Sequence, residues 1–322
     1  MKAARLVIGA RRSPLSRAQA EWAGDRLRER WPGLPVAYRF LSTAGDRDRV
    51  TPLPAIGAKG LFTEELERAL RDGRIDVAVH SLKDLPAESP HGVTLAAVPE
   101  REDPRDVLVV RDVRGGGGRR GGLDVLGRLP AESCVGTSSL RRAAQLRAHR
   151  SDIAPAPIRG NVGTRLRKLD EGGFDALVLA AAGLRRLGLW PPGTSVLDEG
   201  WLPAPGQGAL GLQCRAGDDG VLDRVGALDD PAARAEVTAE RALLAALEGG
   251  CRVPIAARAR RAGEDLRLEA AVYDVAGGRP LEAIGRGLAA NAERLGRELA
   301  ARLLDAGAGA LVARARRSTP FA

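Results

Sequence analysis

One cysteine of the chain, Cys251, has neighbours that suggest a chemical role. In the stretch "LEGGCRVP", Cys251 follows two glycines and precedes an arginine. Such a cysteine could be a small buried side chain, half of a disulfide, a metal ligand, a nucleophile or an anchor for a covalently attached group. The other two cysteines, Cys134 and Cys214, are far away in the sequence, and the three histidines show no paired spacing. Neither a disulfide framework nor a metal site is therefore expected.

A second reactive combination lies in "DVAVHSLKDLP", residues 76–86. The apolar run Val77 to Val79 predicts a strand, and His80, Lys83 and Asp84 come after it, at its C-terminal end. Open α/β sheets usually bind their ligands at that end of their strands. Lys83 and Asp84 could equally form an ion pair on a solvated loop, so the pattern leaves both readings open.

Serine and arginine recur at two expected helix starts. "VIGARRSPLSRAQA" from Val7 and "VGTSSLRRAAQL" from Val135 each predict a strand, a short turn and a helix. Ser13, followed by Pro14, and Ser139 suit helix N-caps, and either could also contact a ligand. Four arginines crowd these helix starts, where the backbone already favours anions: Arg11, Arg12, Arg141 and Arg142. Guanidinium groups bind carboxylates and phosphates in a bidentate way, so an anionic ligand is indicated.

The elements that must position these residues form a repeated pattern. "KGLFTEELERALRDGRIDVAVH" from Lys59 resembles "RGNVGTRLRKLDEGGFDALVLA" from Arg159, and Asp76 and Asp175 precede the two expected strands. Together with the two serine segments, this predicts a duplicated α/β domain. The glycine-rich insertion 115–122 lacks a phosphate-loop pattern and is expected to be a surface loop. From about residue 230, a helix, alternating segments and a second helix predict a small α+β domain.

Composition narrows the function classes. The content of 44% hydrophobic and 28% charged residues is typical of a soluble globular protein, and no apolar run is long enough for a membrane span. The basic N-terminal stretch reads as a first strand and not as a signal peptide, so a cytoplasmic protein is expected. The net charge of +9 could indicate nucleic acid, but aromatic residues make up only 3% and do not cluster. Small acidic ligands fit this composition better.

Four segments occur in an order that resembles one known family: "HSLKDLP", "GTSSLRR", "RGNVGTRL" and "LEGGCRVP". They are similar to the characteristic segments of the hydroxymethylbilane synthase, or porphobilinogen deaminase, family, and the resemblance covers almost the whole chain. It implies two similar domains of the type II periplasmic-binding-protein kind, with mixed sheets around a cleft, and a small α+β C-terminal domain. The implied division is 1–102 with 207–226, then 103–206, then 227–322.

The resemblance also implies an activity. Members of the family are transferases of tetrapyrrole biosynthesis that condense four porphobilinogen molecules, with loss of ammonia, into linear hydroxymethylbilane. By resemblance, Cys251 holds a dipyrromethane cofactor through a thioether, and its glycines leave room for the pyrrole. Asp84 matches the catalytic carboxylate, which would stabilise positive charge on pyrrole nitrogens. No metal is implied.

The remaining family contacts are carried over to matching positions of this sequence. Those that match cofactor contacts are Lys83, Ser139, Arg141 and Arg142. Those that match substrate contacts are Arg11, Ser13, Arg159, Arg165 and Arg186. Because each porphobilinogen brings an acetate and a propionate, a growing product accumulates negative charge that arginines can balance.

Two other function classes compete with the enzyme. A non-catalytic anion-binding protein, such as a solute receptor or sensor domain, could use the same doubled architecture, although it would not need the cysteine of a third domain. A nucleic-acid-binding protein would show salt-sensitive binding to DNA or RNA. For the enzyme, a monomer is expected, because the ligand would lie in a cleft within one chain.

Overall fold

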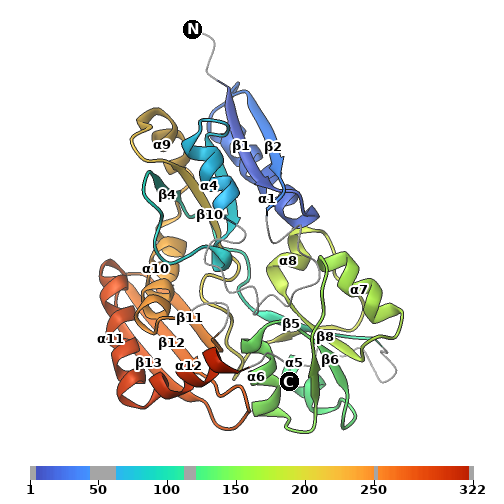
Figure 1. Cartoon of the computed structure of the whole chain (residues 1–322). Coiled ribbons are helices and arrows are strands. Elements are labelled where there is room, and N and C mark those ends of the chain that lie inside the picture. The colour runs from blue at the N-terminus through green and yellow to red at the C-terminus, as the bar shows by residue number, and fades with distance from the viewer. Residues whose placement is uncertain (1–4, 44–62, 112–120, 250–252, 319–322) are drawn as a thin grey trace. The chain divides into compact units, whose positions relative to one another are not determined.

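The computed structural model describes residues 5–43, 63–111, 121–249 and 253–318 (Figure 1). These residues form two compact units. The first contains the described residues up to Glu102 together with Gly208–Arg234, and the second contains Asp103–Gln207 together with the described residues from Ala235 onward. Within the described residues, the chain passes from one unit to the other at residues 102–103, 207–208 and 234–235.

The first unit is built on a five-stranded mixed sheet. Its elements are β1 (Leu6–Arg11), α1 (Pro14–Arg30), β2 (Val36–Leu41), α4 (Glu64–Arg71), β3 (Val77–Ser81), the 3₁₀ turn η1 (Leu82–Asp84), β4 (Val93–Ala97), β10 (Leu210–Arg215) and α9 (Asp219–Gly226). The strand order is β2-β1-β3-β10-β4. β1 pairs in parallel with β2 and β3, whereas β10 is antiparallel to β3 and β4.

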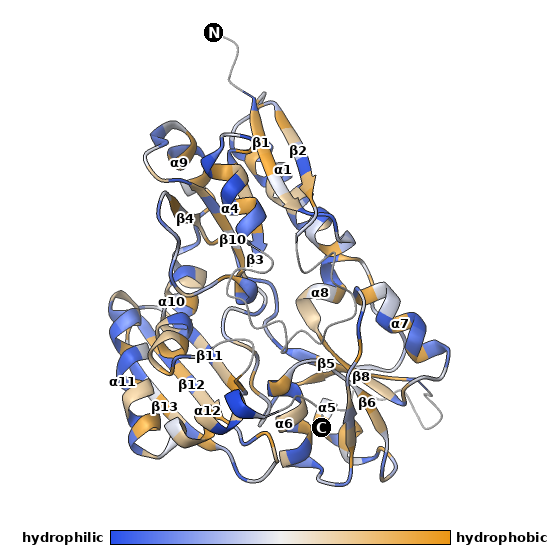
Figure 2. Cartoon of the chain, viewed as in Figure 1, coloured by the Kyte–Doolittle hydropathy of each residue, from blue (hydrophilic) through white to orange (hydrophobic). Residues whose placement is uncertain are grey.

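Local sequence explains how this unit begins. β1 is nearly all apolar, as expected of a strand that is covered on both faces, and Ile8 is fully buried. Ser13 accepts a hydrogen bond from the Ser16 backbone N–H at 3.2 Å and Pro14 occupies the first position of α1. Figure 2 shows β1 largely in orange, the hydrophobic end of the colour scale. The predicted N-cap at Ser13 is therefore confirmed.

A second five-stranded sheet lies in the second unit. Its elements are β5 (Asp106–Val110), α5 (Gly122–Gly127), β6 (Cys134–Gly136), α6 (Leu140–His149), β7 (Ala154–Ala156), α7 (Val162–Asp170), β8 (Ala176–Ala180), α8 (Ala181–Arg186) and β9 (Thr194–Leu197). The order β7-β6-β8-β5-β9 repeats that of the first sheet, again with three parallel strands beside an antiparallel one. The two sheets thus share one topology.

Two aspartates confirm the internal duplication at the level of single hydrogen bonds. Asp76 precedes β3 and accepts the Val7 backbone N–H at 2.8 Å, and Asp175 precedes β8 and accepts the Cys134 backbone N–H at 2.9 Å. Val7 is the second residue of β1, and Cys134 is the first residue of the matching strand β6. Each carboxylate therefore fixes where a central strand starts beside its parallel neighbour, as the sequence match predicts.

The second unit also contains the C-terminal α+β part. Its elements are α10 (Pro231–Ala246), which begins in the first unit, β11 (Ile255–Ala262), β12 (Asp265–Val272), β13 (Leu281–Leu288), the turn η2 (Ala289–Asn291), α11 (Ala292–Asp305) and α12 (Ala308–Arg317). The three strands form an antiparallel sheet in the order β11-β12-β13, and α11 and α12 pack on it (Figure 1). Tyr273 ties this sheet to α6, because its hydroxyl donates to the Gln145 side-chain oxygen at 3.1 Å.

The predicted architecture is confirmed: two similar α/β parts with mixed sheets of the same strand order, and an added α+β part. The division into three domains stays a prediction. Most of the insertion 115–122 lies outside the described residues; Gly122, at its end, already begins α5.

Candidate functional site

In the first unit, the predicted residues gather at one edge of the sheet. β1 ends at Arg11 and its parallel neighbour β3 ends at Ser81, with Gly9 opposite Ala78 in the register. The C-terminal ends of both strands therefore lie at the same edge. Immediately after β3, the turn η1 carries Lys83, which is half-buried, and Asp84, which is exposed.

Side-chain hydrogen bonds hold this edge in place. The Ser81 hydroxyl accepts from the Gln19 amide of α1 at 2.8 Å, and the Leu82 backbone N–H donates to the Ala209 carbonyl at 3.0 Å. Ser13 caps the same helix α1 and is half-buried beside the end of β1. The first turn of α1 and the end of β3 are thus linked, so that Arg11, Ser13 and Asp84 are positioned by one connected set of elements.

In the second unit, Ser139 has the cap role that its sequence position predicts. Its hydroxyl accepts the Arg142 backbone N–H at 3.5 Å at the start of α6. Because the cap uses the hydroxyl as an acceptor, its O–H remains available as a donor to another group. The ligand contact assigned to Ser139 stays a prediction.

Asp106, which the sequence analysis did not single out, pairs with both Arg141 and Arg142, and we call the surroundings of this trio the arginine site. Its side chain is 0% exposed and accepts five hydrogen bonds. Arg142 donates twice to Oδ1, from Nε at 3.1 Å and from Nη2 at 2.7 Å, and Arg141 donates to Oδ2 at 2.7 Å. Trp201 and Gln207 complete the set, both at 2.8 Å. An acidic residue directly before the apolar run "VLVV" was the available signal for a buried strand-start carboxylate.

This arrangement determines the charge state of Asp106. Burial by itself would raise the pKa of this carboxyl, but the charges of Arg141 and Arg142, followed by their hydrogen bonds, lower it well below its usual range. Asp106 is therefore ionised. Since two guanidinium groups share one carboxylate, one positive charge remains uncompensated within the trio.

Two further arginines add positive charge close to the trio. Burial, and then the charges of Arg142 and Arg159, lower the pKa of Arg165 to about 10. Arg165 donates through Nε to the Gly160 carbonyl at 2.9 Å. One terminal nitrogen of Arg159, Nη2, is buried without a hydrogen-bond partner among the described residues. An unpaired buried donor beside neighbouring cations is suited to an anionic ligand.

Two predicted site residues remain, one on α8 and one outside the described residues. Arg186 is half-buried at the C-terminal end of α8, and Cys251 lies outside the described residues. Cys214 is fully buried, which raises the pKa of its thiol to about 12, whereas Cys134 is partly exposed and burial also raises its thiol pKa. The sequence predicts that both cysteines are buried. This prediction is confirmed for Cys214 and wrong for Cys134, which is partly exposed at the start of β6.

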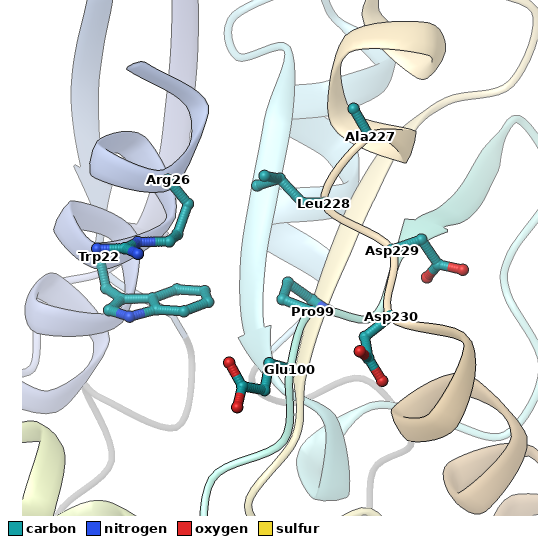
Figure 3. Close-up of a pocket in the computed structure, with 8 residues that line it drawn as sticks. All are labelled: Trp22, Arg26, Pro99, Glu100, Ala227, Leu228, Asp229 and Asp230. Atoms are coloured by element: carbon teal, nitrogen blue, oxygen red, sulfur yellow. The ribbon is translucent and has the colours of Figure 1, made fainter. Parts of the chain in front are cut away.

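A pocket in the first unit contains none of the predicted residues. Trp22 and Arg26 of α1 line one side of it, and Glu100 and Asp229 lie opposite (Figure 3). Asp229 already accepts the Val98 backbone N–H at 2.7 Å and pairs with Arg234. Because Asp229 is already occupied by these two partners, this pocket is a poorer candidate than the arginine site around Asp106.

Neither a metal cluster nor a membrane-spanning helix is present in the described part of the chain. Across residues 5–43, 63–111, 121–249 and 253–318, no three histidine, cysteine or acidic side chains are gathered as a metal ion would require. Over the same ranges, no helix has the length and apolar character to cross a membrane.

Comparison with known proteins identifies the family. Residues 6–223 match the family model described as porphobilinogen deaminase, dipyromethane cofactor binding domain, and residues 234–305 match that of the porphobilinogen deaminase C-terminal domain. The chain belongs to the porphobilinogen deaminase family. A porphobilinogen deaminase from Roseiflexus castenholzii is 50% identical over 312 residues, covering 96% of this chain and 98% of the relative. Another, from Desulforudis audaxviator, is 49% identical and covers 97% and 98%.

Two solved structures of distant proteins give weaker matches. The reduced OxyR regulatory domain from Pseudomonas aeruginosa matches with a TM-score of 0.39 and 15% identity, covering 70% of this chain and 98% of that one. A probable amino-acid transporter binding protein from Bacillus subtilis matches with a TM-score of 0.42 and 12% identity, covering 70% and 90%.

The residues present fit the dipyrromethane cofactor of the porphobilinogen deaminase family. A dipyrromethane with acetate and propionate side chains needs several cationic donors in one place. The second unit supplies them: Arg141 and Arg142 pair with Asp106, Arg165 and Arg159 add two charges nearby, and Arg159 retains an unpaired buried donor among the described residues. The donor set is thus matched to a polycarboxylate.

Proposed function

We propose that the chain is a transferase that condenses four porphobilinogen molecules stepwise, with loss of ammonia, to linear hydroxymethylbilane. The observation that carries the proposal is the excess of positive charge around Asp106. Four arginines and a single carboxylate leave the site cationic, and each porphobilinogen that is added brings two carboxylates. When bound, dipyrromethane supplies the terminal pyrrole to which the first substrate is joined.

The arginines divide into two roles. Arg141 and Arg142 are held rigidly by Asp106, so that their surplus charge has a fixed position for the cofactor carboxylates. Arg159 and Arg165 come after β7, the latter on α7, where their charges favour an incoming or newly added substrate. Lys83 and Ser139 join the cofactor set, and Arg11, Ser13 and Arg186 join the substrate set.

Asp84 is proposed as the catalytic carboxylate. It is exposed at the end of η1, directly after a strand whose end is held by hydrogen bonds on Ser81 and Leu82. Positive charge develops on pyrrole nitrogens during the condensation, and a fixed carboxylate that accepts from N–H stabilises it. Asp84 is therefore the group whose negative charge acts on the reacting atoms.

Cys251 is proposed as the attachment residue. Among the three cysteines, Cys214 is sealed in a strand, and burial raises the thiol pKa of both Cys214 and Cys134, which disfavours the reactive thiolate. Neither is thus suited to form a thioether. The "GGC" sequence gives Cys251 two neighbours without side chains, which leaves space for an incoming ring.

We further propose a cytoplasmic monomer without nucleic-acid or membrane partners. All the proposed site residues belong to one chain, so a second copy is not needed to complete the site. Cys134 and Cys214 are free thiols, as is usual in a reducing compartment.

Intact mass and turnover together test the function. The purified chain should be heavier than its sequence by one dipyrromethane, should consume porphobilinogen and should release ammonia. A mass equal to the sequence, with carboxylate binding but no turnover, would instead support the anion-binding protein.

A further inference from the structure

The first unit contains four buried polar side chains beneath α4 that the reaction scheme does not use. They are Thr63 and Glu67, at the start of α4, His80 of β3 and Gln213 of β10. Their exposures are 2%, 5%, 6% and 0%, in that order. Polar groups are seldom buried so completely without a structural or functional reason.

The strand register places His80 and Gln213 on one face of the sheet. Gln213 lies opposite Ala78, and His80 is two residues beyond Ala78 on the same strand. Side chains two residues apart in a strand share a face. Since Ala78 packs in the core with Leu66 of α4, this face is the one covered by α4. On it, Gln213 is close enough to Glu67 and to His80 to affect the pKa of each.

The four side chains lie close together, yet several of their buried atoms have no direct hydrogen bond. Thr63 Oγ1, Glu67 Oε1, His80 Nε2 and both amide atoms of Gln213 lack a partner in full hydrogen-bonding geometry among the described residues. They are nevertheless close together, because Thr63 and Gln213 oppose the effect of burial on the pKa of Glu67, and Gln213 also opposes it on the pKa of His80. Small side-chain adjustments, with or without a bridging water, would pair these atoms with one another.

Electrostatics favours neutral forms of both titratable members. Burial raises the pKa of Glu67, against the opposing influence of Thr63, Gln213 and Arg71, while Glu64 adds to the rise. Burial lowers the pKa of His80 to about 4, where Gln213 acts against the shift and Arg11 adds to it. His80 is thus an uncharged ring at neutral pH.

We infer that the Gln213 amide joins Glu67 to His80 in a buried hydrogen-bonded chain that positions the end of β3. With Glu67 protonated, its O–H donates to the Gln213 oxygen, and the amide N–H donates to unprotonated Nε2 of His80. With Glu67 ionised, the amide is reversed, its N–H donates to the carboxylate, and His80 N–H donates to the amide oxygen. His80 is uncharged in both arrangements.

The hydrogen-bonded chain matters for the reaction because His80 lies only four residues before Asp84. Ser81 is held from the opposite face by Gln19, and the next three residues form the turn that ends with Asp84. Fixing β3 from both faces limits the movement of the Asp84 carboxylate. Glu67, Gln213 and His80 are therefore positioning residues that act through β3, and this role rests on the function proposed above.

The kinetic test compares holoenzymes of Gln213→Met, Glu67→Met and Glu67→Gln with the parent. The two Met variants remove the hydrogen-bonded chain at similar volume, and kcat should fall by roughly ten- to a hundredfold with KM within about twofold, since a small displacement of a reacting group has such effects. Glu67→Gln keeps an N–H donor and an oxygen acceptor and should retain kcat within about twofold. Leu70→Val, in the same apolar core, is the control for destabilisation alone and should leave kcat unchanged.

A spectroscopic test needs no turnover. Ring ¹⁵N shifts of His80, one of three histidines, should report a neutral ring at pH 6 in the parent and should change in Glu67→Met. Adding Glu67→Met to Gln213→Met should cause no further change, because the link is already lost. If Gln213→Met fails to fold, the Glu67 pair decides by itself.

The inference is overturned if kcat of the Met variants equals that of the parent, if Leu70→Val loses as much, or if Glu67→Met leaves the His80 shifts unaltered. Failure of the parent to consume porphobilinogen would instead remove the proposed function. The ¹⁵N experiment would still decide whether the chain of hydrogen bonds exists.

Discussion

Arg142 donates two hydrogen bonds to Oδ1 of Asp106, from Nε at 3.1 Å and from Nη2 at 2.7 Å, and both side chains are buried. Arg141 holds the other oxygen. The pair of guanidinium groups is therefore preorganised before any ligand arrives, and the carboxylate that holds them does not cancel their charge. This lowers the cost of ordering the side chains when an anion binds.

Replacing Asp106 by Asn should destabilise the second unit by about 3–5 kcal/mol, because two buried guanidinium groups lose their counter-charge. Urea unfolding followed by tryptophan fluorescence measures the effect, and Trp201 donates directly to Asp106. Asp170→Asn, at an exposed position at the end of α7, is the control and should change stability by less than about 0.5 kcal/mol. Equal stabilities of parent and Asp106→Asn would show that the negative charge of Asp106 makes no net contribution to the free energy of unfolding.

The pairing of Asp106 with the two arginines also predicts how the free energy of unfolding depends on pH. The folded-state pKa of Asp106 is depressed, so its contribution to stability is complete above the unfolded pKa of about 4 and is lost as the pH falls further. Unfolding free energies of parent and Asp106→Asn should therefore differ by a constant amount from pH 7 to about pH 5 and should converge below about pH 4. A difference that is already shrinking between pH 7 and 5 would contradict the depressed pKa.

Cys251→Ala should yield protein at the mass of the bare sequence and without activity, since no other thiol is suited to form the thioether. Cys134→Ala and Cys214→Ala serve as matched controls and should keep the added mass. Intact-mass spectrometry of the three variants decides the assignment. An added mass that persists in Cys251→Ala but disappears in one control would transfer the attachment to that residue.

Asp84→Asn should fold and keep the cofactor but lose turnover by about 10²- to 10³-fold. Asn can still accept a hydrogen bond from a pyrrole N–H, yet it lacks the negative charge that opposes the developing cation. Porphobilinogen consumption at saturating substrate is the measurement. Asp72→Asn, which breaks an exposed pair with Arg74 in the same unit, should be nearly unaffected. Activity of Asp84→Asn within about twofold of the parent would exclude this carboxylate from the mechanism.

Arg165→Leu should lower kcat/KM by roughly ten- to a hundredfold, which corresponds to the loss of one charged hydrogen bond of ~1.5–3 kcal/mol. Arg167→Leu on the same helix is a close control, because Arg167 is exposed and pairs only weakly with Glu171 across one turn. The comparison distinguishes the effect of the charge on Arg165 from the effect of the total charge of α7. Similar losses in both variants would mean that net charge, and not the position of Arg165, attracts the substrate.

Some features of the fold can be predicted from local sequence, because their interactions lie within a few residues. Ser13 and Pro14 specify a helix start by their own side-chain chemistry, and Ser139 does the same for α6. The apolar runs after Asp76 and Asp175 specify buried strands, and their similar flanks reveal the duplication. The family resemblance is also visible in the sequence, because each of its motifs is a short contiguous segment, and this resemblance implies the substrate class.

Other features depend on contacts between distant parts of the chain. Asp106 and Arg142 are 36 residues apart, and Glu67 and Gln213 come from segments that share no local pattern. In the sequence, Arg141 and Arg142 look like two unpaired cations, whereas in the fold both are buried and share one aspartate, so that only one of the two charges is compensated. Burial decides which charges are paired within the protein and which remain for a ligand. Removing water makes each charge require a partner, and only the tertiary structure determines which partners are within reach.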